Sequence, residues 1–224
     1  MNQPSHAKET GFTARRRHMV DKQLIARGLR DARLLEAARA IPREEFVHPE
    51  LRSRCYRDEP VPIGHGQTLS QPYMAALMVD SLGLRGGENV LEVGAGCGYH
   101  AALLGSMAAR VVSIELVPEL ADLARENLSR TGYGKNVTVL CGDGSAGWLS
   151  RAPYDAISVA AGSPSVPQAL LDQLAEGGRL VIPVGNRKDQ SLLLIERQGG
   201  QFKSSTITGC RFVPLLGEHG WRES

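Results

Sequence analysis

Short apolar runs alternate with amphipathic segments over the last two thirds of the chain. The runs are rich in valine and isoleucine, and the strands they predict are NVLEV (89–93), RVVSIE (110–115), NVTVLCGD (136–143), YDAISVAAG (154–162) and RLVIPVG (179–185). Apolar positions at helical spacing follow, and the predicted helices are YHAALLGSMA (99–108), PELADLARENLSRTG (118–132) and VPQALLDQLAEGG (166–178). Buried strands that alternate with helices indicate βαβ units, so the pattern predicts an α/β fold with a doubly wound, mainly parallel sheet.

The two ends of the chain show other patterns. Residues 13–28 have helical spacing and stop at Gly28, and a second predicted helix is capped by Asp31 and closes before Pro42. Prolines and glycines over 43–68 indicate turns and extended pieces. The late runs SLLLIERQ (191–198) and KSSTITGCRFVPL (203–215) are separated by a short turn, so they should pair antiparallel at one edge of the sheet.

Composition limits the possible partners. The 26 basic and 24 acidic residues are interspersed and give a net charge of +2, which argues against nucleic acid as a partner. The basic run over 15–17 is expected to be a solvated helix face. The first 19 residues have no apolar core of signal-peptide length, and no run approaches the roughly 20 apolar residues that span a bilayer. We therefore expect a cytoplasmic protein without a membrane partner.

The four cysteines give no sign of a metal site or a disulfide framework. They are far apart in the chain, contain no CxxC pair and have no histidine at ligand spacing; they are Cys55, Cys97, Cys141 and Cys210. The expected state is four reduced thiols, mostly packed in the core, with no bound metal.

The glycine-rich turn after the first predicted strand indicates a ligand-binding loop. EVGAGCGY places Gly94, Gly96 and Gly98 between a strand and a helix, where glycine permits a tight turn and the close approach of a ligand. A dinucleotide fingerprint requires its third glycine five residues after the first, and that position is Tyr99. The spacing therefore disfavours a nicotinamide-dependent oxidoreductase.

Acidic residues end the next two predicted strands. Glu115 is placed to accept hydrogen bonds from a ribose diol, and Asp143, beside Gly144, is placed to receive an adenine amino group. Each has a structural alternative, since Glu115 is also a favourable charge at a helix start and Asp143 is a common turn residue. Because the carboxyl ends of parallel strands meet at one edge, the three strand ends together predict a nucleoside-binding crevice.

The polar stretch GQTLSQP (66–72) has two interpretations. Ser70 precedes the helical segment 71–82 and is a favourable N-cap residue, while Pro72 suits the first helical turn. The same hydroxyl could instead contact a reacting group. The pattern alone favours the cap.

Several motifs resemble those of class I S-adenosylmethionine-dependent methyltransferases, which have a Rossmann-like sheet: VLEVGAGCGY, SIE, GDG and GGRLVIPVG. Within that superfamily the chain is similar to the protein-L-isoaspartate (D-aspartate) O-methyltransferase family from about residue 19 to 216. The similar segments are 19–47, 66–78, 166–185 and RFVPL at 211–215. IPREEFV and GQTLSQP are not general methyltransferase features, so the resemblance is specific.

The resemblance implies a protein repair enzyme. Such an enzyme transfers a methyl group from S-adenosylmethionine to the free α-carboxylate of L-isoaspartyl residues in damaged peptides and proteins, and releases S-adenosylhomocysteine. That carboxylate is already ionised at neutral pH and needs no general base. Catalysis then depends on orientation and on the exclusion of water.

The resemblance also assigns roles to particular residues. Ser70 becomes the catalytic residue that orients the carboxylate. The implied cofactor-binding residues are Thr68, Ser70, Gly94, Ala95, Gly96, Gly98, Glu115, Asp143 and Gly144. Three residues are expected to border the peptide groove: Pro183, Val184 and Val213. The chain departs from the family pattern at Ala95, Cys97 and Leu216, where many or some members carry hydroxyl residues.

The implied organisation is a flexible N-terminus (1–18) followed by a single methyltransferase domain (19–224), expected to be a monomer. Within it, 19–80 form an α-rich portion with the active-site loop, and 81–224 form the cofactor-binding α/β core.

Two other functions are compatible with the motifs: a methyltransferase that acts on a different carboxylate or on a small molecule, and a binding protein that keeps the nucleoside pocket without turnover.

Overall fold

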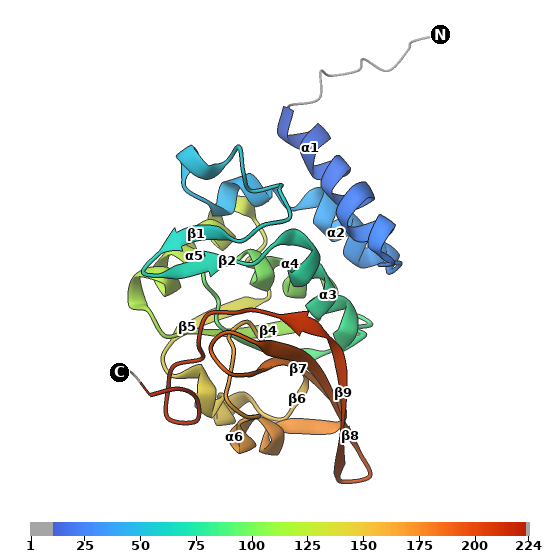
Figure 1. Cartoon of the computed structure of the whole chain (residues 1–224), viewed down its shortest axis with the longest axis vertical. Coiled ribbons are helices and arrows are strands. Elements are labelled where there is room, and N and C mark those ends of the chain that lie inside the picture. The colour runs from blue at the N-terminus through green and yellow to red at the C-terminus, as the bar shows by residue number, and fades with distance from the viewer. Residues whose placement is uncertain (1–10, 223–224) are drawn as a thin grey trace.

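A seven-stranded sheet forms the centre of the computed structural model, which describes residues 11–222 (Figure 1). The strands lie in the order β5-β4-β3-β6-β7-β8-β9. Their bounds are β3 Asn89–Val93, β4 Arg110–Glu115, β5 Val137–Cys141, β6 Tyr154–Val159, β7 Leu174–Gly185, β8 Gln190–Gln198 and β9 Gln201–Cys210. The five strands β3 to β7 are parallel, while β8 and β9 run antiparallel at one edge. The structure confirms the predicted α/β class and the antiparallel pair at the edge.

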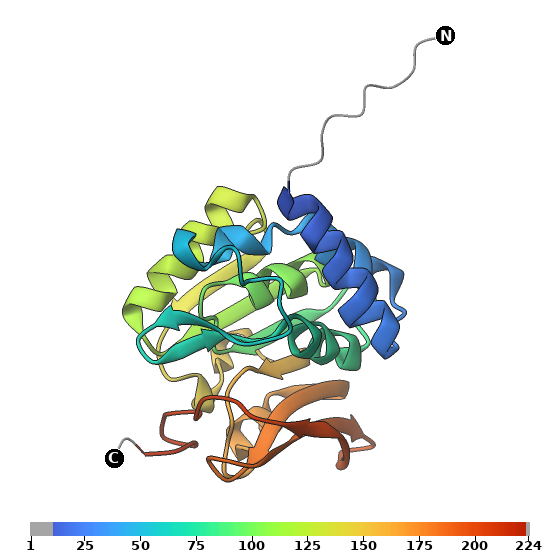
Figure 2. The same ribbon diagram turned by 45° about the horizontal axis from the view of Figure 1, so that its top comes forward.

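Helices cover the two faces of the sheet unequally. Successive strand residues such as Val90 and Leu91 point to opposite faces of the sheet. Val90 belongs to a core cluster with side chains of α2, α3, α4 and α5, whereas Leu91 packs with Leu170 of α6. The helices are α2 Ala32–Ala40, α3 Pro72–Leu82, α4 Tyr99–Met107, α5 Pro118–Thr131 and α6 Gln168–Asp172. In Figure 2 the N-terminal helices, drawn in blue, lie at the opposite end of the molecule from β8 and β9.

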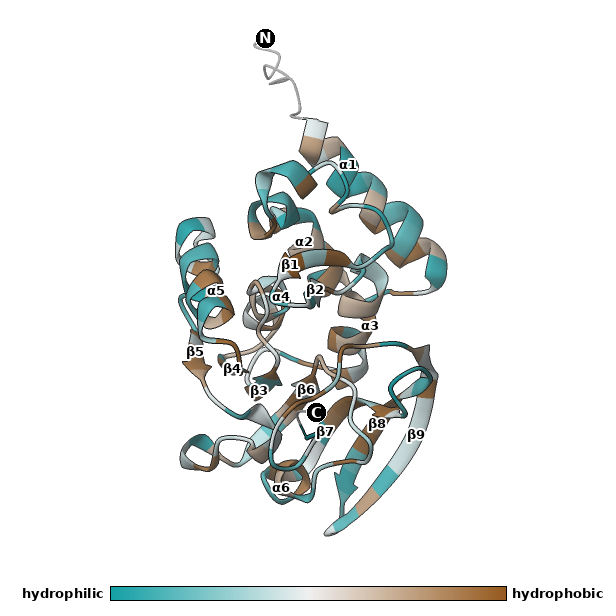
Figure 3. Ribbon diagram, turned by 60° about the vertical axis from the view of Figure 1, so that its left-hand side comes forward, coloured by the Kyte–Doolittle hydropathy of each residue, from teal (hydrophilic) through white to brown (hydrophobic). Residues whose placement is uncertain are grey.

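The edge strand β9 is polar over most of its length, as the teal and pale colours in Figure 3 show. Its first six residues are exposed, and β9 pairs with β8 through a tight turn at Gly199 and Gly200, which have φ values of 61° and 75°. Polar side chains on an edge strand disfavour pairing with another chain.

The N-terminal helices begin and end close to their predicted positions. The first helix, α1 Gly11–Met19, continues through a π-helical turn (Val20–Leu24) and a 3₁₀ turn (Ile25–Arg27) and stops at Gly28, whose φ of 101° is left-handed. Asp31 caps α2, since its carboxylate accepts hydrogen bonds from the N–H groups of Arg33 and Leu34 at 2.8 and 3.1 Å. Both predicted signals are confirmed.

Two expectations for the N-terminus are corrected. The flexible segment was expected to span 1–18, but residues 11–18 are helical, and 1–10 lie outside the described residues. The basic run is not wholly a solvated face, because Arg16 is only 9% exposed. Its guanidinium donates to the Glu44 carboxylate at 2.9 Å and to the Tyr56 hydroxyl at 3.0 Å. A helical pattern alone cannot reveal an ion pair with a residue 28 positions away or a hydrogen bond to a residue 40 positions away.

The helix predicted over 166–178 is much shorter than expected. Helix α6 ends at Asp172, and β7 begins at Leu174. Tyr154 pairs with Leu174 and Ala156 with Arg179, so a bulge in β7 accommodates the extra residues. Gly177 lies in that bulge with a φ of 76°, a left-handed conformation that glycine adopts at low cost. The glycines therefore belong to a bulged strand rather than to a helix end.

Candidate active site

A cavity of about 420 Å³ lies beyond the carboxyl ends of β3, β4 and β6. The strand order reverses between β3 and β6, and open α/β sheets bind their ligands at such a point. The volume is typical of a small-molecule site. Seven of the nine predicted cofactor residues line this cavity, namely Thr68, Ser70, Gly94, Ala95, Gly96, Glu115 and Gly144, whereas Gly98 and Asp143 do not.

The glycine turn after β3 keeps its shape through backbone contacts. Gly94, Gly96 and Gly98 have φ values of 93°, 54° and 90°, all in the left-handed region. A Cβ on Gly98 would lie 3.1 Å from the carbonyl oxygen of Ala124, so this glycine permits α4 to pack closely on α5. Gly98 also caps α4 without any side-chain bond. The first turn of α4 thus presents N–H groups near the cavity, although Gly98 itself does not line it.

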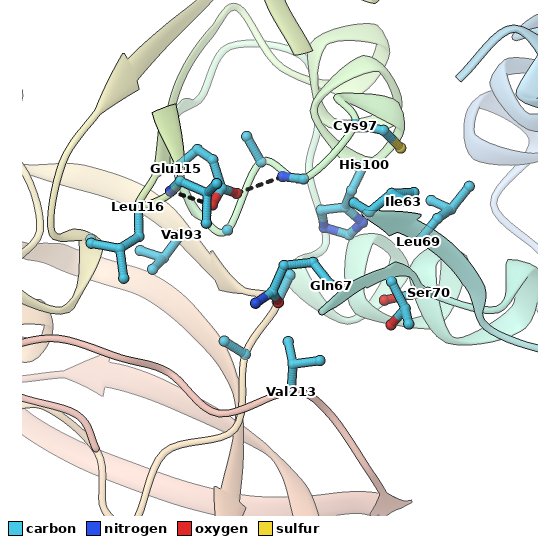
Figure 4. Close-up of a pocket in the computed structure, with 18 of the residues that line it drawn as sticks. Ile63, Gln67, Leu69, Ser70, Val93, Cys97, His100, Glu115, Leu116 and Val213 are labelled. Atoms are coloured by element: carbon cyan, nitrogen blue, oxygen red, sulfur yellow. Dashed lines mark hydrogen bonds between the residues drawn. The ribbon is translucent and has the colours of Figure 1, made fainter. Parts of the chain in front are cut away.

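Glu115 is fixed at the cavity wall by two backbone bonds, drawn as dashed lines in Figure 4. Its Oε2 accepts from the Gly96 N–H at 2.8 Å, and its Oε1 accepts from the Val117 N–H at 3.0 Å. The residue is 6% exposed. Each carboxylate oxygen has a second lone pair, so Glu115 can accept further hydrogen bonds from a ligand in the cavity.

Asp143 holds the C-terminal segment rather than lining the cavity. Its Oδ1 accepts from the N–H and hydroxyl of Ser145 at 2.8 and 2.6 Å, and its Oδ2 accepts from the N–H of Glu218 at 2.7 Å. Burial opposes ionisation, but these hydrogen bonds outweigh it and hold the pKa of Asp143 below its usual range. The neighbouring Gly144 does line the cavity. Asp143 is therefore an ionised anchor next to the site.

A β-hairpin that the sequence pattern did not predict brings Thr68 and Ser70 to the cavity. It consists of β1 Val61–Gly64 and β2 Gln67–Leu69. The loop residues His65 and Gly66 have φ values of 51° and 71°, which is typical of a type I′ turn. The usable signal was the GHG tripeptide between two short extended runs. Figure 4 shows Gln67 and Ser70 on the hairpin side of the cavity and Glu115 on the opposite side.

The prediction that Ser70 caps α3 is wrong. The N-cap of α3 is Gln71, which makes no side-chain capping bond, and Ser70 lies one residue earlier. Pro72 has no N–H to cap, and the N–H of Tyr73 donates to Asp58 at 3.3 Å. A carboxylate from a different segment thus performs the capping role. The Ser70 hydroxyl is not used by the helix.

Sequence reasoning missed His100, which also lines the cavity. Its Nε2 lies 3.0 Å from the Ser158 hydroxyl, and burial lowers the pKa of His100 to about 4. The imidazole is therefore neutral at physiological pH. The available signal was a polar side chain in the first turn of an otherwise apolar helix directly after the glycine turn.

Glu92 lies in β3 directly before Val93 of the cavity wall, on the same face of the sheet as Val90, which α4 covers. It accepts a short hydrogen bond from the Ser113 hydroxyl, and its Oε1 has no hydrogen-bond partner among the described residues. Burial raises the pKa of Glu92 to about 8, and the neighbouring Glu115 carboxylate adds to the shift. Glu92 is therefore mostly protonated at neutral pH.

A second cavity of about 620 Å³ adjoins the first, and the two share Thr68, Ser70, Ala160, Val213 and Pro214 in their walls. Val213, which the resemblance expects at the border of the peptide groove, lines both cavities. Pro183 and Val184 line neither cavity. The Pro183 carbonyl accepts from the Ser163 N–H at 2.9 Å and is used within the fold, so the geometry does not support these two residues as groove walls.

No group of three histidine, cysteine or acidic residues within 11–222 could hold a metal ion. All four cysteines are free thiols, of which Cys55 and Cys97 are buried, while Cys141 is exposed and Cys210 is half-buried. The expectation that most of them lie in the core is thus only half correct.

None of the helices in the described part of the chain is both long and apolar enough to cross a bilayer.

Comparisons with known proteins agree on one family. The family model described as protein-L-isoaspartate(D-aspartate) O-methyltransferase (PCMT) matches residues 14–220. Protein-L-isoaspartate O-methyltransferase 2 of Marinobacter nauticus is 55% identical over 92% of this chain and 94% of its own length. Protein-L-isoaspartate O-methyltransferase 1 of Syntrophobacter fumaroxidans is 51% identical over 94% of this chain and 98% of its own length.

Two solved structures support the same assignment. One, a protein-L-isoaspartate O-methyltransferase, has a TM-score of 0.81 and 33% identity, and the match covers 91% of this chain and 67% of that one. The other is the Plasmodium falciparum protein in complex with S-adenosyl-L-homocysteine, with a TM-score of 0.78 and 25% identity over 90% of this chain and 98% of that one.

Proposed function

The chain belongs to the protein-L-isoaspartate(D-aspartate) O-methyltransferase family, and from that premise we propose which of its residues bind the methyl donor and which orient the acceptor. It is a protein repair enzyme that transfers a methyl group from S-adenosylmethionine to the free α-carboxylate of L-isoaspartyl residues. The residue assignments that follow rest on the two adjoining cavities.

The first cavity has the chemistry that S-adenosylmethionine requires. Glu115 offers carboxylate lone pairs to a ribose diol, and the first turn of α4 offers N–H groups to the carboxylate of the methionine portion. Leu116 and Leu215 provide apolar wall for a purine ring, and Gly144 leaves space beside them. We assign Asp143 to the adenine end, where its ionised carboxylate fixes the adjoining backbone.

Bound S-adenosylmethionine supplies an electrophilic methyl group on a positively charged sulfur. The acceptor carboxylate is ionised at neutral pH, so no residue of this chain has to remove a proton. The Ser70 hydroxyl donates a hydrogen bond to one carboxylate oxygen and directs the other toward the first cavity. His100 lines the same cavity and is neutral, so it would add no positive charge to a site that holds a sulfonium.

The observation that carries this assignment is the position of Ser70 in the wall common to both cavities. An acceptor in the second cavity and a donor in the first would meet at that residue. Val213 lies in the same common wall and would form part of the groove for the peptide chain. We further propose that residues 19–224 act as one domain, because a single core cluster includes Leu34, Val79 and Val90.

We propose a monomer that works in the cytoplasm without nucleic acid or membrane as partner. The large exposed apolar side chains of the described part are few and mostly scattered: Leu116, Trp148, Leu149 and Phe202. Free thiols are the usual state in a reducing compartment, and the interspersed charges give no basic surface.

The decisive experiment uses two peptides that are identical except that one carries L-isoaspartate and the other L-aspartate. We expect base-labile methylation of the isoaspartyl peptide alone. Equal methylation of both peptides, or methylation of neither while S-adenosylmethionine still binds, would contradict the assignment of the acceptor. A panel of small carboxylic acids would then test the alternative acceptor class.

A further inference from the structure

The cavity that adjoins the cofactor pocket has a cationic rim. Thirteen residues line this acceptor cavity, and the two that carry charge are Arg187 and Arg211. Arg187 lies in the turn between β7 and β8, and Arg211 directly follows β9. The remaining lining residues are neutral and include Met74, Phe212 and Val213. No carboxylate therefore balances the two guanidinium groups inside the cavity.

Neither arginine forms an ion pair or a side-chain hydrogen bond with any residue that the structure describes. Arg187 packs over the ring of Trp221 with its guanidinium carbon 5.2 Å from the ring centroid. Trp221 is itself held by a hydrogen bond from its Nε1 to the Gly162 carbonyl at 3.0 Å. Stacking on a fixed ring restricts Arg187 but leaves its N–H groups available to a ligand.

A buried glutamine ties together the two segments that carry these arginines. Gln190 is 6% exposed, and its Oε1 accepts from the N–H of Phe212 at 2.8 Å. Its Nε2 donates to the Asn186 carbonyl at 3.3 Å and to the Phe212 carbonyl at 3.2 Å. Asn186 precedes Arg187, and Phe212 follows Arg211. The spacing of the two arginine backbones is therefore set by the fold.

We propose that Arg187 and Arg211 bind an acidic side chain of the substrate near its isoaspartyl residue, so that this enzyme prefers acidic segments of damaged proteins. The inference rests on the proposed function, since it takes the second cavity as the acceptor groove. A guanidinium group donates two parallel hydrogen bonds to a carboxylate, and two unpaired guanidinium groups on one groove favour such a partner. The attraction also increases the rate at which acidic segments reach the groove.

The test uses three isoaspartyl peptides of equal length. One has only glutamine around the isoaspartyl residue, one has two glutamates on the N-terminal side, and one has two glutamates on the C-terminal side. We expect one or both glutamate peptides to exceed the glutamine peptide in kcat/KM by about 3- to 10-fold, mainly through KM. This range corresponds to one or two exposed ion pairs.

The double variant Arg187→Gln and Arg211→Gln should reduce that preference to within twofold, because its KM for the glutamate peptides should rise toward its KM for the glutamine peptide. Lys188→Gln is the matched control, because Lys188 is an exposed neighbour that does not line the cavity, and it should keep the preference. Raising the salt concentration should weaken the preference in the wild type and in the control alike.

The possible outcomes distinguish a wrong acceptor from a wrong role of the two arginines. If no isoaspartyl peptide is methylated, the proposed acceptor itself is wrong. If all three peptides are methylated equally well, or if the preference survives in the double variant, the acceptor stands and the cationic rim has no role in substrate choice. Loss of the preference in the Lys188 control would show a general surface-charge effect and would likewise overturn the proposal.

Discussion

Arg43 donates a hydrogen bond from its guanidinium group to the carbonyl oxygen of Ser70 at 2.6 Å. The same guanidinium donates to the Cys55 carbonyl at 2.6 Å and lies over the ring of Tyr99, 4.7 Å from the centroid. It is fully buried. One side chain therefore joins the N-terminal portion, the segment that carries Ser70 and the first residue after the glycine turn.

Arg43→Lys should lower kcat by about tenfold or more with a smaller effect on the affinity for S-adenosylmethionine. A lysine keeps the charge but cannot reach two carbonyls and a ring together, and small displacements of an orienting residue cost up to about 10²-fold in rate. Single-turnover kinetics with an isoaspartyl peptide would measure the effect. Arg39→Lys is the control, since Arg39 makes an exposed ion pair with Asp21. Equal losses in both variants would argue against a positioning role.

Ser70→Ala should reduce kcat by roughly 10- to 100-fold, because a hydrogen bond to a charged group contributes about 1.5–3 kcal/mol. The dissociation constant for S-adenosylmethionine should change less than twofold. Ser81→Ala provides the comparison, since the Ser81 hydroxyl donates to the Leu77 carbonyl within α3. Calorimetry and initial rates measure the two quantities. Weakened cofactor binding with normal turnover of the bound complex would assign Ser70 to the cofactor pocket alone.

Glu115→Gln should weaken the binding of S-adenosylhomocysteine by about 10- to 100-fold. Both oxygens of Glu115 accept from backbone N–H groups, and a carboxamide would place an NH₂ group against one of them. Calorimetry would measure the loss. Glu119→Gln, at an exposed position in the first turn of α5, should bind normally. Normal binding by the Glu115 variant would show that its carboxylate serves only the turn.

The parts of this fold that the sequence predicted depend on local signals. The end of β3 before Gly94, the end of β4 at Glu115 and the helix cap at Asp31 follow from residue type and spacing within a few positions. These features need no knowledge of distant contacts. The glycine turn and the two acidic strand ends together predicted a nucleoside crevice, and a cavity lies at the carboxyl ends of these strands.

The features that sequence reasoning missed depend on contacts between distant segments. Asp58 caps α3 from another part of the chain, so Ser70 looked like the cap. Arg16 and Arg43 stand in ordinary helical or loop patterns, and only the tertiary structure buries them against Glu44 and the Ser70 carbonyl. Periodicity records which residues are buried, but it does not record their partners.

The buried carboxyl group of Glu92 should make the stability of the protein depend on pH. Its pKa is raised by burial from an ordinary value of 4.5 to about 8. The folded state therefore holds a proton that the unfolded state has lost, and the free energy of unfolding decreases as the pH rises toward 8. Between pH 6.5 and 8 the decrease should be about 2 kcal/mol, since one pKa unit corresponds to about 1.4 kcal/mol.

His100 acts in the opposite direction at lower pH. Burial lowers its pKa from 6.5 to about 4, so acidification from pH 6.5 destabilises the folded state. Because the two effects oppose each other between pH 4.5 and 6.5, the contribution of Glu92 is isolated above pH 6.5. Urea unfolding of the wild type and of Glu92→Gln at pH 6.5, 7.2 and 8 would measure it. The variant should lose most of the decrease. An equal decrease in both proteins would show that other groups cause it.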